Sequence, residues 1–152
     1  MAEVSTSNGK QYRVESCFTD PRHLRTRFIY PDRRETYDLR DGSIQIAETG
    51  KPDSSGGDPE RRVAFGHNFH ALALNAGRWG TAGILPLPFG GTMTVLARAD
   101  GIPSEISFSN PDTTPYSLKF SDWRGDTPYR LDLIHAGVTY RYRFTKVEFV
   151  GC

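Results

Sequence analysis

Hydrophobic and polar residues alternate with a period of two through the first third of the chain. The alternation runs through Tyr12–Phe18, Leu24–Tyr30, Tyr37–Leu39 and Ile44–Ile46, and turn signals such as Asp20-Pro21 separate these runs. Alternation with β-branched and aromatic residues is typical of half-buried strands. The pattern therefore predicts a four-stranded antiparallel meander within residues 1–48.

The same pattern returns after residue 92 and predicts five more strands. They cover residues 93–98, 105–109, 116–121, 129–135 and 138–150. A sheet of about nine strands does not stay flat, because every strand twists. We expect a mainly β protein with a strongly curled antiparallel sheet, either a half-barrel or a barrel.

The middle of the chain breaks this alternation. Residues 49–62 are rich in Gly, Ser, Pro and Asp and predict a mobile loop. Within residues 65–76, apolar residues follow a helical spacing, and residues 80–91 are apolar but interrupted by Gly and Pro. We expect residues 65–91 to form a lid, one helix plus an irregular apolar segment, over the concave side of a single domain, 1–152.

Composition and charge limit the kinds of partner that the protein could bind. The chain has 152 residues, with 19 basic and 18 acidic side chains and a net charge of +1. That balance argues against a nucleic-acid-binding protein, which needs clustered positive charge. No apolar run approaches the roughly 20 residues of a transmembrane helix. The first residues form no signal peptide, so we expect a cytoplasmic protein or a chain that starts at its mature N-terminus or at the start of a domain.

The two cysteines, Cys17 and Cys152, are too few for a disulfide framework or a four-cysteine zinc site. Two free thiols are the favoured interpretation. The alternative is a bridge between them, which requires neighbouring first and last strands and an oxidising compartment.

The inward face of the predicted sheet is apolar and aromatic, which leaves two interpretations open. One is an ordinary core filled by its own side chains, and the other is a hollow that binds an apolar ligand. For the second, the candidate ligand-binding residues are Phe28, Tyr30, Tyr37, Leu39, Phe69, Leu72, Phe108, Phe120, Leu131, Leu133, Tyr140 and Tyr142.

Catalytic signals are weak. His67 and His70 have a spacing that could hold a divalent ion, but the predicted helix contains no Asp or Glu, so we predict neither metal nor cofactor. There is no nucleophile elbow, phosphate loop or dinucleotide fingerprint. We favour a protein without enzymatic activity. A small barrel-type enzyme with His67, His70, Asp122 or Tyr142 at the mouth of the hollow is the alternative.

Arginines gather on the faces opposite to the apolar ones. Arg25 and Arg27 share one strand face, and Arg141 and Arg143 share another. Such residues usually form a solvated outer face with cross-strand ion pairs. A ligand-free interaction module that uses a sheet edge or this Arg-rich face is a further alternative.

Several segments resemble the LolA-like family of outer-membrane lipoprotein-sorting proteins. The run from Phe120 to His135, which holds an Asp-Trp-Arg turn and Pro128, and the strand from Tyr140 to Phe149 resemble the closing hairpins of that family. The segments Tyr12–Glu15 and Leu24–Gly42 are similar to its opening meander.

The resemblance implies an unclosed barrel in the bacterial periplasm that carries acyl chains beneath a lid. The chain lacks the family's amphipathic helix before the first strand and has one predicted lid helix where the family has several. The expected partner is a lipid or another hydrophobic small molecule, or the acyl group of a lipoprotein. A related domain that binds a different apolar ligand, or none, fits the same residues.

Overall fold

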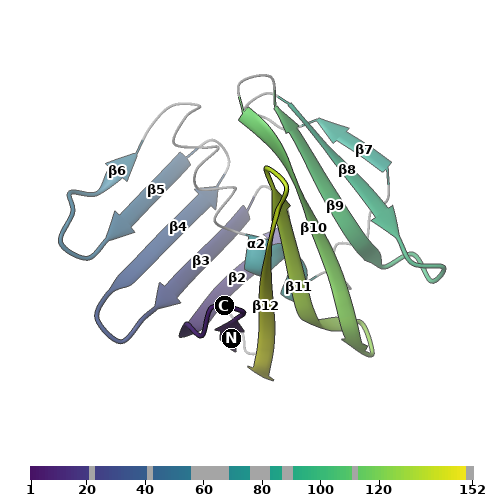
Figure 1. Cartoon of the computed structure of the whole chain (residues 1–152). Coiled ribbons are helices and arrows are strands. Elements are labelled where there is room, and N and C mark those ends of the chain that lie inside the picture. The colour runs from purple at the N-terminus through teal and green to yellow at the C-terminus, as the bar shows by residue number, and fades with distance from the viewer. Residues whose placement is uncertain are drawn as a thin grey trace. The chain divides into compact units, whose positions relative to one another are not determined.

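The structure, a computed structural model, contains one antiparallel sheet whose strand order is β6-β5-β4-β3-β2-β1-β12-β11-β10-β9-β8-β7 (Figure 1). It describes residues 1–20, 23–40, 43–55, 69–75, 83–86, 91–110 and 113–149. The mainly β, antiparallel prediction is confirmed. Strands that follow one another in the chain pair with each other, apart from β6 and β7, which form the two edges, and β1 lies beside β12.

The chain divides into two compact units, which are described separately. Unit 1 comprises Met1–Leu72 and Phe144–Cys152, and unit 2 comprises Ala73–Arg143. The strands of unit 1 are β1 (Ala2–Thr6), β2 (Gln11–Asp20), β3 (His23–Ile29), β4 (Arg34–Arg40), β5 (Ser43–Glu48) and β6 (Ser54–Ser55). They form the predicted opening meander, with additional strands at both ends.

Unit 2 holds the second run of strands. These are β7 (Gly83–Pro86), β8 (Thr92–Ala97), β9 (Pro103–Asn110), β10 (Thr113–Arg124), β11 (Thr127–His135) and β12 (Val138–Val147), the last of which continues into unit 1 from Phe144 onward. The five strands predicted after residue 92 correspond to β8–β12.

Three strands in the structure had no counterpart among the nine predicted: β1, β6 and β7. β6 has two residues and β7 has four, which is too short for a period of two to stand out. β7 lies in the Gly- and Pro-containing segment that was expected to be irregular. Its position at the edge of the sheet explains how Pro86 is tolerated, because an edge strand can lack a ladder donor.

The predicted barrel closure and strong curl of the sheet are wrong. The strand order leaves β6 and β7 as two free edges, and the sheet is neither closed nor strongly curled. Closure requires the two edge strands to pair along their length. A two-residue strand and a four-residue strand that ends in proline provide few groups for such a ladder.

The predicted covering helix is also wrong. The helix in the described residues is α2 (Phe69–Leu74), six residues from within the predicted range 65–76. Fewer than two helical turns cannot cover the face of a sheet. Residues 65–68, 76–82 and 87–90 of the predicted lid lie outside the described residues, as do residues 56–62 of the predicted loop. No helix in the described part of the chain is long and apolar enough to cross a membrane.

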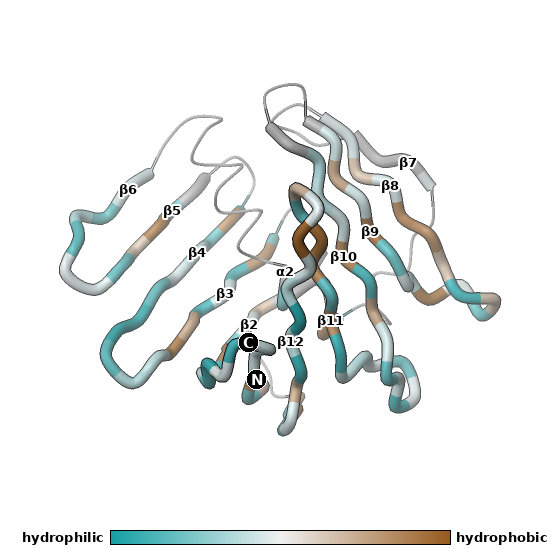
Figure 2. The backbone as a smooth tube through the Cα atoms, in the orientation of Figure 1, coloured by the Kyte–Doolittle hydropathy of each residue, from teal (hydrophilic) through white to brown (hydrophobic). Residues whose placement is uncertain are grey.

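Alternation decides which side chains form the cores. In unit 1 the buried residues include Val14, Leu24, Phe28, Tyr37 and Leu39, whereas their sequence neighbours are more exposed. Unit 2 repeats the pattern along β8–β11, and the backbone tube in Figure 2 changes between hydrophobic and hydrophilic colours along these strands. Each unit therefore has one apolar face, called here the inner face, and one polar outer face.

Cys17 is disulfide-bonded, so the favoured prediction of two free thiols is wrong for this residue. The chain contains one other cysteine, Cys152, which lies outside the described residues.

Candidate functional site

The inner face of unit 2 is built from side chains aligned in rows across neighbouring strands. One row runs from Val95 on β8 through Ile106, Leu118 and Leu133 to Tyr140 on β12. A parallel row contains, in the same strand order, Met93, Phe108, Tyr116, His135 and Val138. These rows place apolar residues from sequence positions far apart onto one continuous surface.

A tight turn sets the register of the last two strands. Ala136 and Gly137 have φ values of 50° and 76°, the left-handed conformation that a two-residue hairpin turn of type I′ requires at both positions. The turn places His135 opposite Val138, and the next inner-face pair is Leu133 with Tyr140. The sequence Ala136-Gly137 therefore fixes which β12 side chains join the inner face.

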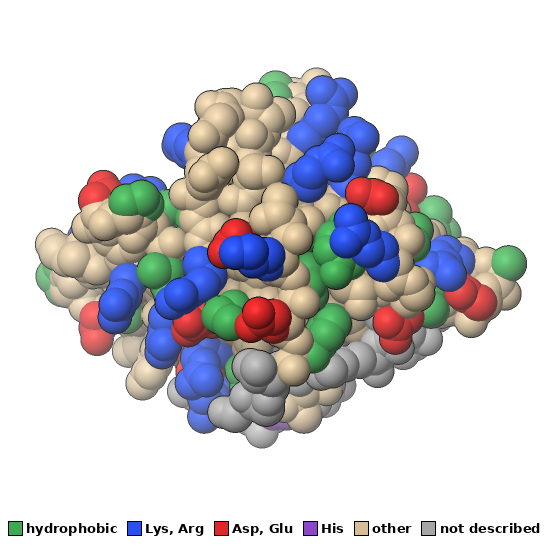
Figure 3. Space-filling model, turned by 90° about the horizontal axis from the view of Figure 1, so that it is seen from below, with side chains coloured by type: hydrophobic (Ala, Val, Ile, Leu, Met, Phe, Trp, Pro, Cys, Tyr) green, Lys and Arg blue, Asp and Glu red, His purple; other side chains and the backbone are tan. Residues whose placement is uncertain are grey.

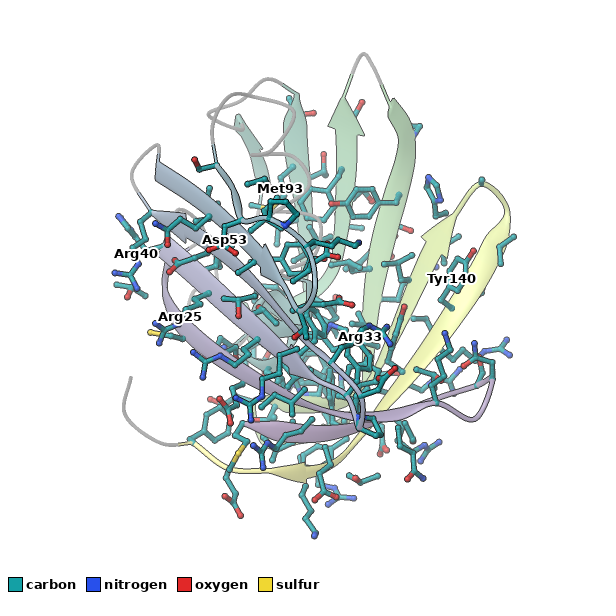
Figure 4. The ribbon with its side chains drawn as sticks, turned by 90° about the vertical axis from the view of Figure 1, so that its left-hand side faces the viewer. Arg25, Arg33, Arg40, Asp53, Met93 and Tyr140 are labelled. Atoms are coloured by element: carbon teal, nitrogen blue, oxygen red, sulfur yellow. The ribbon has the colours of Figure 1, made fainter. Side chains whose placement is uncertain are left out.

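Burial decreases across these rows from the middle strands toward β12. Ile106 and Leu118 are each 0% exposed, whereas Tyr140 is 46% and Val138 is 50% exposed. Leu133 and Tyr142 are half-buried. We call Leu133, Val138, Tyr140 and Tyr142 the open strip; Tyr140 lies near the turn end of β12 in Figure 4.

Next to the open strip, the inner face of unit 2 contains stacked aromatic side chains. Phe108 and Tyr116 stack with ring centroids 4.6 Å apart and an interplanar angle of 24°. Burial raises the pKa of the Tyr116 hydroxyl above its ordinary value, and burial also raises that of Tyr142. Both hydroxyls therefore stay neutral over the physiological range and can contact an apolar ligand without a charge cost.

Unit 1 uses its predicted ligand-binding residues differently. Phe28 forms edge-to-face contacts with Tyr37 at 5.9 Å and with His70 at 5.2 Å between ring centroids. Tyr30 stacks against Phe28 at 6.4 Å and is half-buried, whereas Leu39 is 3% exposed. These side chains pack against one another, as expected for the filled-core interpretation of this face.

His70 forms the centre of that cluster. It is 0% exposed, its Nε2 shares a hydrogen bond of 2.8 Å with the hydroxyl of Tyr12, and its ring lies 5.9 Å from that of Phe144. We call Tyr12, Phe28, Tyr30, Tyr37, His70 and Phe144 the aromatic cluster. The short helix α2 therefore contributes a core side chain to unit 1.

The residues predicted for a metal site or an enzyme active site do not form one cluster among the described residues. His67 lies outside the described residues, and the described ones contain no group of three His, Cys, Asp or Glu side chains placed to hold a metal ion. His70 belongs to unit 1, whereas Asp122 and Tyr142 belong to unit 2. Asp122 faces Arg143 at 3.8 Å, an exposed pair.

The side chains of Phe69 and Leu72, both predicted to bind ligand, lie outside the described part of the structure. The remaining predicted residues on β9–β12 fall into two groups. Phe108, Phe120 and Leu131 are buried beneath the inner face, and Leu133, Tyr140 and Tyr142 belong to the open strip.

Sequence reasoning did not assign several residues to these faces. It considered His135 only as a distant metal ligand, whereas the short Ala-Gly turn forces His135 and Val138 to face each other. Tyr12 shares a face of β2 with Val14, which lies opposite Phe28, but it was not selected as a ligand-binding residue. Tyr116 begins the strand predicted over residues 116–121, but it was not assigned to the apolar face.

The outer faces carry ion pairs, as predicted for a solvated surface. Glu15 pairs with Arg13 at 3.2 Å and with Arg27 at 3.3 Å, and Arg40 pairs with Asp38 at 3.1 Å. Arg25 and Arg40 point away from the strands in Figure 4. Basic and acidic side chains lie beside each other over much of the surface in Figure 3, so the visible face is not uniformly charged.

Comparison of the chain with models of protein families gave no match, and comparison with curated proteins gave none either.

Proposed function

We propose that the protein binds an apolar ligand, such as an acyl chain, along the open strip of unit 2. The observation that carries the proposal is the continuity of the inner face. Its apolar rows are buried over β9 and β10 and reach solvent at Val138 and Tyr140.

Exposure of these residues is unusual for the inner face of a sheet. Val138 and Tyr140 are among four exposed large hydrophobic side chains in the described residues, and they lie on the same face of the same strand. Single exposed apolar residues are common, but a continuous apolar area commonly marks a binding site.

Apolar contact supplies the driving force for such a ligand. Each fully buried methylene contributes about 0.8 kcal/mol, so a twelve-carbon chain that buries about half of its surface on the strip gains on the order of 5 kcal/mol before the cost of ordering it. The strip is one strand pair wide, and four residues of β12 span roughly 13 Å. A medium-length acyl chain lying along the strands would cover it.

Two further features support carriage of lipid outside the cytoplasm. Cys17 is disulfide-bonded, and such bonds persist in oxidising compartments such as the bacterial periplasm. The closing hairpins that contain the open strip are also the segments that resemble LolA-like proteins. We therefore propose a periplasmic location and place an acyl-chain ligand, including that of a lipoprotein, at this strip.

The test is a fluorescence titration with N-phenyl-1-naphthylamine, a neutral apolar dye. Tyr140→Asp places a charge in the open strip, and Thr139→Asp places the same charge on the outer face of the same strand. A buried carboxylate is strongly disfavoured, so we expect Tyr140→Asp to weaken dye binding at least about tenfold. Thr139→Asp should leave it unchanged within about twofold.

Thermal unfolding of both variants must first show that they fold. Equal loss of dye binding in both folded variants would place the site elsewhere. A folded wild-type protein that does not enhance dye fluorescence would contradict the proposed function.

A further inference from the structure

We infer that the ligand of the open strip is an anionic amphiphile, whose headgroup is bound by His135 at the turn end of β11. The inference rests on the proposed function and adds the chemical class of the ligand. A carboxylate and a phosphate share the required charge and hydrogen-bond acceptors.

His135 occupies one end of the apolar surface. It lies directly between Tyr116 on β10 and Val138 on β12, at the last position of β11 before the turn. The side chain is half-buried, and no ion pair or side-chain hydrogen bond involves it in the described part of the chain. Its ring nitrogens are therefore available to a ligand headgroup beside the exposed apolar residues.

Among the described side chains at this end of the inner face, the imidazole of His135 is the group that can carry a positive charge. The described inner-face residues around it are Leu133 on its own strand, Tyr116 and Leu118 on β10, and Val138 and Tyr140 on β12. The titratable ones are the two tyrosines, and burial raises the pKa of Tyr116. These rows contain no Asp, Glu, Lys or Arg among the described residues.

The arrangement matches an amphiphile lying along the strand. A headgroup at His135 would place its chain over Leu133 and Tyr140 and onward to Tyr142, in the direction of Leu131. A protonated imidazole carries a positive charge and two N–H donors, both of which an anionic headgroup can use. Because acid favours the protonated imidazole, attraction to an anion should increase as the pH falls.

The experiment compares ligands with the same chain and different headgroups. Laurate, dodecyl phosphate and neutral 1-dodecanol, each below its aggregation limit, are used to displace N-phenyl-1-naphthylamine at about pH 5.5 and pH 8. We expect wild-type protein to bind at least one of the two anions about tenfold more tightly at the lower pH, and dodecanol equally at both. The preferred anion distinguishes a carboxylate from a phosphate headgroup.

Two variants assign the effect to His135. His135→Gln keeps a polar side chain without the charge, and should lose the pH dependence for the anion while binding dodecanol like the wild type. His135→Lys keeps the charge at both pH values, and should bind the anion about equally at both. The adjacent outer-face variant Ile134→Gln is the matched control and should retain the wild-type pH dependence.

The outcomes separate this inference from the proposed function. If dodecanol binds but neither anion shows a pH dependence that His135→Gln removes, the headgroup assignment is overturned and the open strip still holds an apolar ligand. If neither dodecanol nor the dye binds, the proposed function itself fails.

Discussion

The two units use similar apolar faces in different ways. In unit 1, rings from β2, β3, β4 and the end of β12 meet around His70 in the aromatic cluster. In unit 2, the inner face has a buried part over β8–β10 and an open strip on β11 and β12. The same alternation thus produces a filled core in one unit and an exposed apolar surface in the other.

The difference depends on which side chains contact the aromatic residues of β12. Phe144 is covered by the His70 ring and is 1% exposed, although it shares a strand and a face with Tyr140, which is 46% exposed. The filled end of β12 is therefore the end at which the buried His70 side chain of α2 packs against the strand. Burial along one strand is decided by tertiary contacts that the strand's own pattern does not contain.

The largest predicted effect compares these two residues of β12. Phe144→Ala should lower the free energy of unfolding by about 3–5 kcal/mol, because it opens a cavity against His70. Tyr140→Ala should change it by less than about 1 kcal/mol, because the side chain is 46% exposed. Urea denaturation followed by circular dichroism measures both values. Similar losses in the two variants would show that the open strip is part of the core.

A smaller effect is expected from the hydrogen bond inside the aromatic cluster. Tyr12→Phe removes the hydroxyl that bonds Nε2 of the buried His70, and should cost about 1–3 kcal/mol of unfolding free energy. Tyr140→Phe removes an exposed hydroxyl and serves as the matched control, with an expected change below about 0.5 kcal/mol. If the two substitutions had equal effects, the Tyr12–His70 bond would contribute nothing specific to unit 1.

Strand positions could be predicted from sequence because alternation is a local property. Nine strands appear where the pattern placed them, and the paired rows of β8–β12 bury the predicted Phe108, Phe120 and Leu131. The short edge strands β6 and β7 could not be found, because a period of two needs several residues.

The candidate site was predictable only in part. Leu133, Tyr140 and Tyr142 were identified from their shared face, but their exposure depends on side chains contributed by other elements. The long-range contact between Tyr12 and His70 joins positions 58 residues apart, and no local pattern encodes such a pair. Closure of the sheet was mispredicted because strand twist alone does not supply two long edges that can pair.

The last prediction compares a buried tyrosine of unit 1 with a half-buried tyrosine of unit 2 at alkaline pH. Burial raises the pKa of Tyr116 in unit 2, and burial together with the carboxylates of Glu35 and Glu48 raises that of Tyr37 in unit 1. In the unfolded chain both hydroxyls ionise near pH 10, so the folded state then holds more protons than the unfolded state. The stabilisation is therefore complete below about pH 10 and is lost as the pH rises, by at most about 1.4 kcal/mol per pH unit for each tyrosine.

Tyr116→Phe and Tyr37→Phe should each make the loss of stability between about pH 9 and pH 11 less steep, as measured by urea denaturation at both values. Added salt screens partly exposed charges, and the carboxylates near Tyr37 are 15% exposed at Glu35 and 24% at Glu48. Because burial is the cause that acts on Tyr116, its contribution should not depend on salt, whereas that of Tyr37 should decrease. If both variants lost stability between about pH 9 and pH 11 as steeply as the wild type, neither phenol would be as buried as the structure shows. The filled face and the open face would then differ less than these exposures indicate.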